Sequence, residues 1–116
     1  MPEDTKALSE GILEPHEFLA QARIAGDENI QQFEHVLSEF DTGLLFYYFG
    51  NLDQTSHMMW RAMDPEHPAY DPNHDPEYAN VVYELYERMD DVLGFAMQHV
   101  DTATTLIAMS ASSAKY

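Results

Sequence analysis

A run of six large apolar residues, residues 44–49, constrains the fold more than any other stretch of the chain. The run is too short for an isolated helix and is rich in aromatic residues, which is typical of a strand buried on both faces. Gly50 and Asn51 follow directly and end the run. The sequence therefore predicts a central strand of an α/β fold at this point.

Two candidate metal ligands, Asp53 and His57, come just after the predicted strand. In open α/β sheets, ligands bind beyond the carboxyl ends of the strands. A carboxylate and an imidazole at that edge suit a borderline metal such as zinc. Because a spacing of four residues is a loose pattern, a structural alternative stays open. In that alternative Asp53 caps a helical turn and His57 packs beside Met58 and Trp60.

Length and charge restrict the partners of the chain. Its 116 residues correspond to one small domain, and 21 acidic against 5 basic side chains give a net charge of -16. Nucleic acids and anionic membranes would be repelled by that charge, so neither is expected as a partner. Cysteine is absent, which excludes disulfides and thiol chemistry. No signal-peptide pattern and no apolar run of about 20 residues occurs, so we expect a soluble chain.

Helical spacing predicts two helices before the strand. Pro15 suits the first helical position, Gly26 can close the first helix, and Asp27 can cap the second. The apolar stripes are Phe18, Leu19 and Ala22 in the first helix and Ile30, Phe33, Leu37 and Phe40 in the second. His16 and His35 on these helices are interpreted as ordinary surface histidines. Residues 1–13 lack periodicity and are expected to form a flexible lead-in.

Residues 63–76 hold four of the six prolines and predict an irregular, ordered loop. Its side chains include a set of potential metal ligands: Asp64, His67, Asp71, His74 and Asp75. Pairs such as Asp-Pro and His-Pro are also turn formers, and a loop of this polarity is usually solvated. The turn interpretation is therefore favoured over a second metal cluster.

A long amphipathic helix is predicted after the loop, with Asp75 as its cap and Pro76 at its first position. Apolar residues recur at helical spacing as far as Val100, which gives a helix of about 24 residues. Residues 104–110 then form a second apolar, β-branched run. Strand, helix and strand make a βαβ unit with parallel strands. Since two strands leave both sheet edges unpaired, we expect a homo-oligomer formed through exposed strand edges.

From the strand onward the chain resembles the alkaline phosphatase superfamily, in its type I phosphodiesterase and nucleotide pyrophosphatase branch. Members carry an apolar strand followed by Asp-x-x-x-His, matched by residues 46–49 and by Asp53 and His57. A subset continues as D-x-x-S-H-M-x-W-R and D-P-x-H-P-x-Y, which match residues 53–61 and 64–70. The resemblance extends over about residues 40–110.

The resemblance implies a fragment of an αβα sandwich from a metal-dependent hydrolase. In the family two metal ions, usually zinc, activate a threonine or serine for attack on phosphorus and give a covalent phospho-enzyme. By the match, Asp53 and His57 would be ligands of one ion, and a histidine beyond this chain would be the third. The substrate of the full-length protein would be a phosphate ester.

Other residues of the family site are missing. An Asp-His-Gly run is expected after the last strand, where this chain has Ala111, Ser112 and Ser113. We therefore interpret residues 14–110 as one partial α/β domain with a foreign tail at 111–116, whose main partner is the remainder of a parent polypeptide. Two alternatives stay open: a degenerate relative, or a non-catalytic acidic interaction or metal-binding domain that docks through its helical pair. Alone, the chain should bind zinc weakly and lack phosphoesterase activity.

Overall fold

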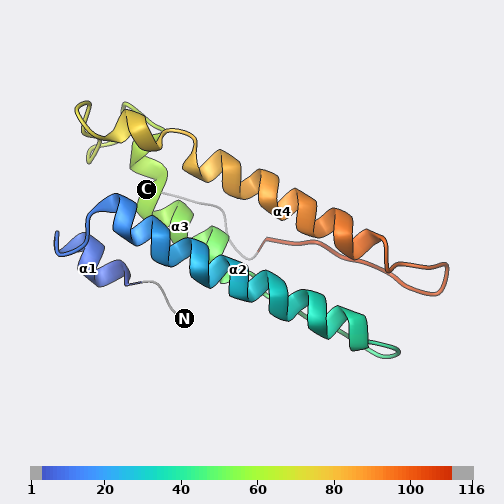
Figure 1. Ribbon diagram of the computed structural model, residues 1–116. Coiled ribbons are helices and arrows are strands. Elements are labelled where there is room, and N and C mark those ends of the chain that lie inside the picture. The colour runs from blue at the N-terminus through green and yellow to red at the C-terminus, as the bar shows by residue number, and fades with distance from the viewer. Residues whose placement is uncertain (1–3, 111–116) are drawn as a thin grey trace. The chain divides into compact units, whose positions relative to one another are not determined.

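The computed structural model describes residues 4–110, and their regular structure is helical (Figure 1). Contacts divide the chain into two compact units, Met1–Asn51 and Leu52–Tyr116. The predicted α/β fold with parallel strands is wrong, because no strand forms within residues 4–110. Among these residues, no helix combines the length and the apolar character needed to cross a membrane. The predicted tail at 111–116 lies outside the described residues.

The first unit begins with a short helix, α1 (Thr5–Ser9), inside the stretch that the sequence treats as a lead-in. The carboxylate of Asp4 caps it by accepting a hydrogen bond from the Ala7 backbone N–H at 2.9 Å. The backbone N–H groups of Ile12 and Leu13 both donate to the Ala7 carbonyl, which folds the chain back after the helix. The region therefore has its own hydrogen-bonded structure.

Helix α2 (Pro15–Glu39) is one continuous helix where the sequence predicts two. Glu14 and Glu17 form a capping box at its start, and Pro15 occupies the first turn as predicted. Gly26 does not end the helix, because its φ is not positive and it lies buried within α2. Glycine in a helix costs only about 1 kcal/mol relative to alanine, which the continuing apolar face can offset. The predicted helical pair is therefore wrong.

Residues 44–49 leave a turn at Gly43, where φ is +104°, and run back beside α2 (Figure 1). Their side chains alternate: Leu45, Tyr47 and Phe49 are half-buried, whereas Leu44, Phe46 and Tyr48 are exposed. The Tyr47 hydroxyl donates to the Asn29 carbonyl at 3.0 Å. The run thus has the alternation of a strand without a partner strand among the described residues, and the prediction of a strand buried on both faces is wrong.

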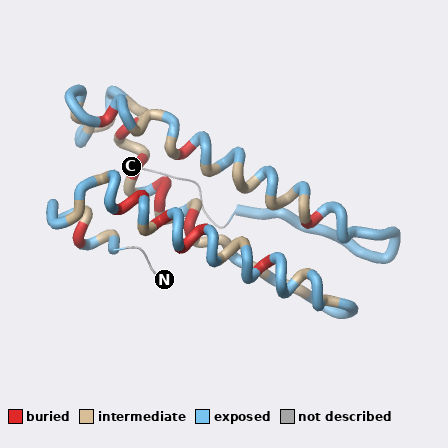
Figure 2. The backbone as a smooth tube through the Cα atoms, viewed as in Figure 1, coloured by how far each residue is buried: buried red, intermediate tan, exposed pale blue. Residues whose placement is uncertain are grey.

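Three aromatic rings attach this segment to α2. The ring centroid of Phe33 lies 5.2 Å from that of Tyr47 and 5.1 Å from that of Phe49. The Tyr47 and Phe49 centroids are 4.9 Å apart, so each ring contacts both others in a tilted or edge-on arrangement. This cluster and the buried residues on the N-terminal half of α2, which are red in Figure 2, together form the core of the first unit.

The second unit starts within α3 (Gly50–Met59) and continues through two 3₁₀ turns, η1 (Trp60–Ala62) and η2 (Asp75–Tyr78). Residues 63–74 between them form turns, which confirms the predicted irregular loop. Pro76 lies in the first turn of η2, but the long helix starts later than predicted, as α4 (Val81–Met97). Val82 and Ala96 of α4 are buried.

Residues 101–110 are exposed throughout and form no strand (Figure 2). Asp101 organises the turn after α4: its carboxylate accepts hydrogen bonds from the Ala103 N–H at 2.9 Å and the Thr104 hydroxyl at 2.7 Å. The Thr104 hydroxyl, and then the Ala103 N–H, hold the pKa of Asp101 below its usual value. The predicted second strand and βαβ unit are therefore wrong, although the turn between helix and apolar run lies where the sequence places it.

Candidate functional site

Asp53 and His57 lie one turn apart on α3, in the segment that the sequence places just beyond the carboxyl end of a strand. The Nε2 atom of His57 is 3.1 Å from Oδ1 of Asp53, and both side chains are about half exposed. A spacing of four residues places two side chains on the same face of a helix. The local sequence therefore brings a carboxylate and an imidazole together without any contribution from a sheet.

The opposite side of α3 explains why this pair faces outward. Asn51, Thr55, Met59 and Ala62 are buried and follow one another at helical spacing through α3 and η1. The Asn51 side-chain N–H donates to the Ala22 carbonyl of α2 at 3.0 Å, and this hydrogen bond holds the first residues of α3 against α2. Asp53 also lies in the first turn, where a negative side chain interacts favourably with the helix dipole.

Two hydroxyl groups next to the pair, Thr55 Oγ1 and Ser56 Oγ, are buried and have no hydrogen-bond partner within residues 4–110. Unpaired polar atoms are rare in protein interiors, because each costs about 1–3 kcal/mol. Nothing in the sequence indicates that these two residues are buried, since serine and threonine are commonly exposed. The buried face of α3 contains the polar residues Asn51, Thr55 and Ser56. The spacing of apolar residues in the sequence therefore does not predict this helix.

Asp75 is the centre of the proline-rich loop, and its side chain is only 2% exposed. Its Oδ2 accepts a hydrogen bond from the Asp71 N–H at 2.8 Å, and its Oδ1 lies 3.8 Å from Nε of Arg61. These contacts connect η2 to η1 across the loop. The prediction that Asp75 caps the long helix is wrong, because its carboxylate binds back into the loop preceding η2.

The other polar side chains of the loop shape turns. Asp64 accepts from the Glu66 N–H, Asp71 from the Asn73 N–H, and Nδ1 of His67 from the Ala69 N–H, all at 2.9–3.0 Å. Nε2 of His74 lies 4.0 Å from the Asp71 carboxylate. Across residues 4–110, no three histidine, aspartate or glutamate side chains gather closely enough to hold a metal ion. The turn interpretation of the loop therefore accounts for its polar residues.

No family model, curated protein or solved structure matches this chain in a comparison with known proteins. The resemblance to the alkaline phosphatase superfamily consequently stays a prediction from the motifs at residues 53–61 and 64–70. The family ligands expected at residues 111–113 lie outside the described residues.

Proposed function

We propose that the chain supplies Asp53 and His57 as two ligands of a divalent metal site that groups beyond residues 4–110 complete. The observation that supports this proposal is the 3.1 Å separation of Asp53 Oδ1 and His57 Nε2 on one half-exposed helix face. Two donors at this spacing on a helix can approach one ion, as in helical zinc motifs. The ion would be one of the two zinc ions of a phosphodiesterase- or nucleotide pyrophosphatase-like hydrolase, with the remainder of a parent polypeptide as partner.

The donor chemistry fits zinc, but two donors are fewer than a complete site needs. Catalytic zinc sites use three protein ligands and structural sites use four. Bound zinc polarises a phosphoryl oxygen and stabilises the charge that develops on it. Asp53 and His57 would hold the ion from one side, and His57 Nε2 would exchange its contact with the Asp53 carboxylate for the ion. The chain alone therefore has weak zinc affinity and no phosphoesterase activity.

The chain contains a matched control for this site. His35 and Glu39 form a second carboxylate–imidazole pair with the same spacing, at 3.6 Å and more exposed. We expect the imidazole NMR signals of His57 to shift first when zinc is added in 0.5 M salt, since salt screens the nonspecific attraction of a protein with net charge -16. His57→Ala should remove this salt-resistant binding, whereas His35→Ala should leave it unchanged.

Two results would contradict the proposal. Equal loss of zinc binding in the two alanine variants would show that any exposed pair of this spacing binds the ion. Turnover of a nitrophenyl phosphodiester by the purified chain, abolished by His57→Ala, would show that the chain carries a complete site.

A second candidate function is a non-catalytic acidic interaction domain. The observation in its favour is the exposure of Leu44, Phe46 and Tyr48 in a chain with 21 acidic residues. Clustered apolar side chains on a surface commonly mark protein–protein contacts. Self-association also stays a prediction, and light scattering over a wide concentration range tests it.

A further inference from the structure

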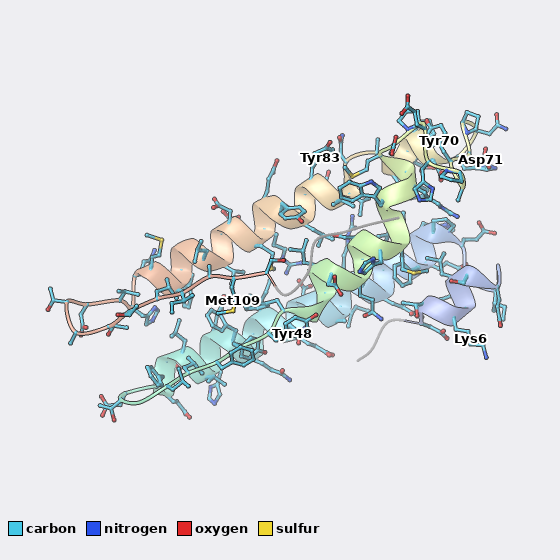
Figure 3. All side chains as sticks on the ribbon, turned by 180° about the vertical axis from the view of Figure 1, so that it is seen from behind. Lys6, Tyr48, Tyr70, Asp71, Tyr83 and Met109 are labelled. Atoms are coloured by element: carbon cyan, nitrogen blue, oxygen red, sulfur yellow. The ribbon has the colours of Figure 1, made fainter. Side chains whose placement is uncertain are left out.

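The exposed side of residues 44–49 forms an apolar ridge made of Leu44, Phe46 and Tyr48. Their exposed fractions are 92%, 74% and 60%, and Figure 3 shows Tyr48 on the segment that follows α2. The alternate residues Tyr47 and Phe49 pack on Phe33, so the segment is held in place while the ridge faces away. The ridge is thus a fixed surface, and it does not depend on the metal pair.

The main chain beneath the ridge is also available. Within residues 4–110, the backbone groups of residues 44–47 form no backbone hydrogen bond. An extended segment with unpaired N–H and C=O groups and alternating side chains has the features that strand-adding partners recognise. Main-chain pairing would supply affinity, and the spaces between Leu44, Phe46 and Tyr48 would select the side chains of the partner.

The charge around the ridge has one sign. Between Arg23 and Arg61 the chain contains no lysine or arginine. Glu34 and Glu39 on α2 and Asp41 at the turn are exposed, and α2 has no basic residue in its last turn. The C-terminal end of a helix adds a partial negative charge of its own. The surroundings of the ridge therefore attract a cation and repel an anion.

We propose that residues 44–48 are a docking edge for an extended polypeptide segment that alternates apolar with lysine or arginine residues. The apolar side chains of this partner pack between those of the ridge, and its basic side chains lie near Glu39 and Asp41. A second copy of the chain is a poorer occupant, because it adds a further charge of -16 and has no basic residue beside its own ridge.

The test uses the full chain and a labelled ten-residue peptide of alternating valine and lysine, with binding followed by fluorescence anisotropy. Three peptide controls accompany it: glutamate in place of lysine, N-methylation of alternate residues, and a shuffled order. Phe46→Ser removes the centre of the ridge. Ile12→Ser is its matched control, since Ile12 is 72% exposed and lies outside the ridge.

We expect the valine–lysine peptide to bind the wild-type chain and the Ile12→Ser variant with the same affinity. Phe46→Ser should lower the affinity for this peptide by roughly tenfold or more, as expected for the loss of a buried phenylalanine contact. N-methylation, shuffling or glutamate should each weaken binding similarly, and added salt should lower the affinity. Unchanged affinity in Phe46→Ser, or equal binding of the N-methylated peptide, would overturn the proposal. So would dimerisation that strengthens with salt and is lost in Phe46→Ser, because a second copy would then occupy the ridge.

Discussion

Replacing Phe33 by alanine tests whether the aromatic cluster holds residues 44–49 on α2. Phe33 is buried and is in ring contact with both Tyr47 and Phe49. Burial of a phenylalanine side chain contributes about 1.5–3 kcal/mol, and each ring pair adds about 0.5–1.5 kcal/mol. Because the surrounding core is small and can relax, we expect Phe33→Ala to lower the free energy of unfolding of the first unit by about 3 kcal/mol, at the lower end of measured phenylalanine-to-alanine losses.

The change should be visible as detachment of the segment from α2. A loss of about 3 kcal/mol raises the population of the open form by roughly 100-fold, and cleavage by a protease follows that population when opening is fast. Chymotrypsin cleavage after the aromatic residues at 46–49, followed by mass spectrometry, measures this directly. Phe46→Ala is the control, because Phe46 is exposed and makes none of these ring contacts. If the two variants unfold within about 1 kcal/mol of each other, the cluster does not anchor the segment.

Three further predictions concern two glycines, the buried Asp75 and the hydroxyl group of Tyr47. Gly94→Ala in α4 should stabilise the protein by about 0.5–1 kcal/mol, since no atom lies within 4 Å of the added Cβ. Gly43→Ala should destabilise it by about 1 kcal/mol, because φ there is +104°. Urea unfolding of both variants measures whether the free energy of unfolding rises in the first and falls in the second. Asp75→Ala should lower the free energy of unfolding by about 2 kcal/mol, because the Asp71 N–H loses its acceptor and Arg61 loses its ion-pair partner. A loss no greater than that of Asp71→Ala in the same urea titration would refute the central role of Asp75. Burial raises the pKa of Tyr47 above 10.0. Its contribution to stability is therefore complete below pH 10 and falls as pH rises through the folded-state pKa. In Tyr47→Phe the melting temperature should fall less steeply over this alkaline range, which thermal unfolding at several pH values measures.

The helices that form and the predicted strands that do not form show what hydrophobic spacing can and cannot predict. Apolar residues at helical spacing correctly indicate helical structure in the regions of α2 and α4, although α2 is one helix instead of two and Tyr86 and Met97 of the α4 stripe are exposed. The alternation in residues 44–49 is equally real, but the same pattern arises when an extended segment lies on a helix. A β-strand also needs a neighbouring strand to pair with, and the sequence of the segment does not show whether such a neighbour exists.

Errors of detail have similar physical origins. Gly26 and Asp27 suggest a helix boundary, but glycine disfavours a helix only weakly, and neighbouring contacts decide the outcome. The four-residue spacing of Asp53 and His57 is enough to bring their side chains within 3.1 Å once α3 forms. The contact between Asp75 and Arg61 joins residues on the two sides of a whole loop, so local sequence could not predict it.

The contacts of the first unit are made within residues 4–51, before the second unit begins, and this has a kinetic consequence. The hydrogen bonds that hold its parts together join residues separated by 15 to 29 positions, from Tyr47 with Gln32 to Asn51 with Ala22. Folding rates rise as contact order falls, because short loops close at little entropic cost. The turn at Gly43 can therefore bring the aromatic rings onto α2 soon after residue 51 leaves the ribosome, before most of α3 and all of α4 have emerged from it.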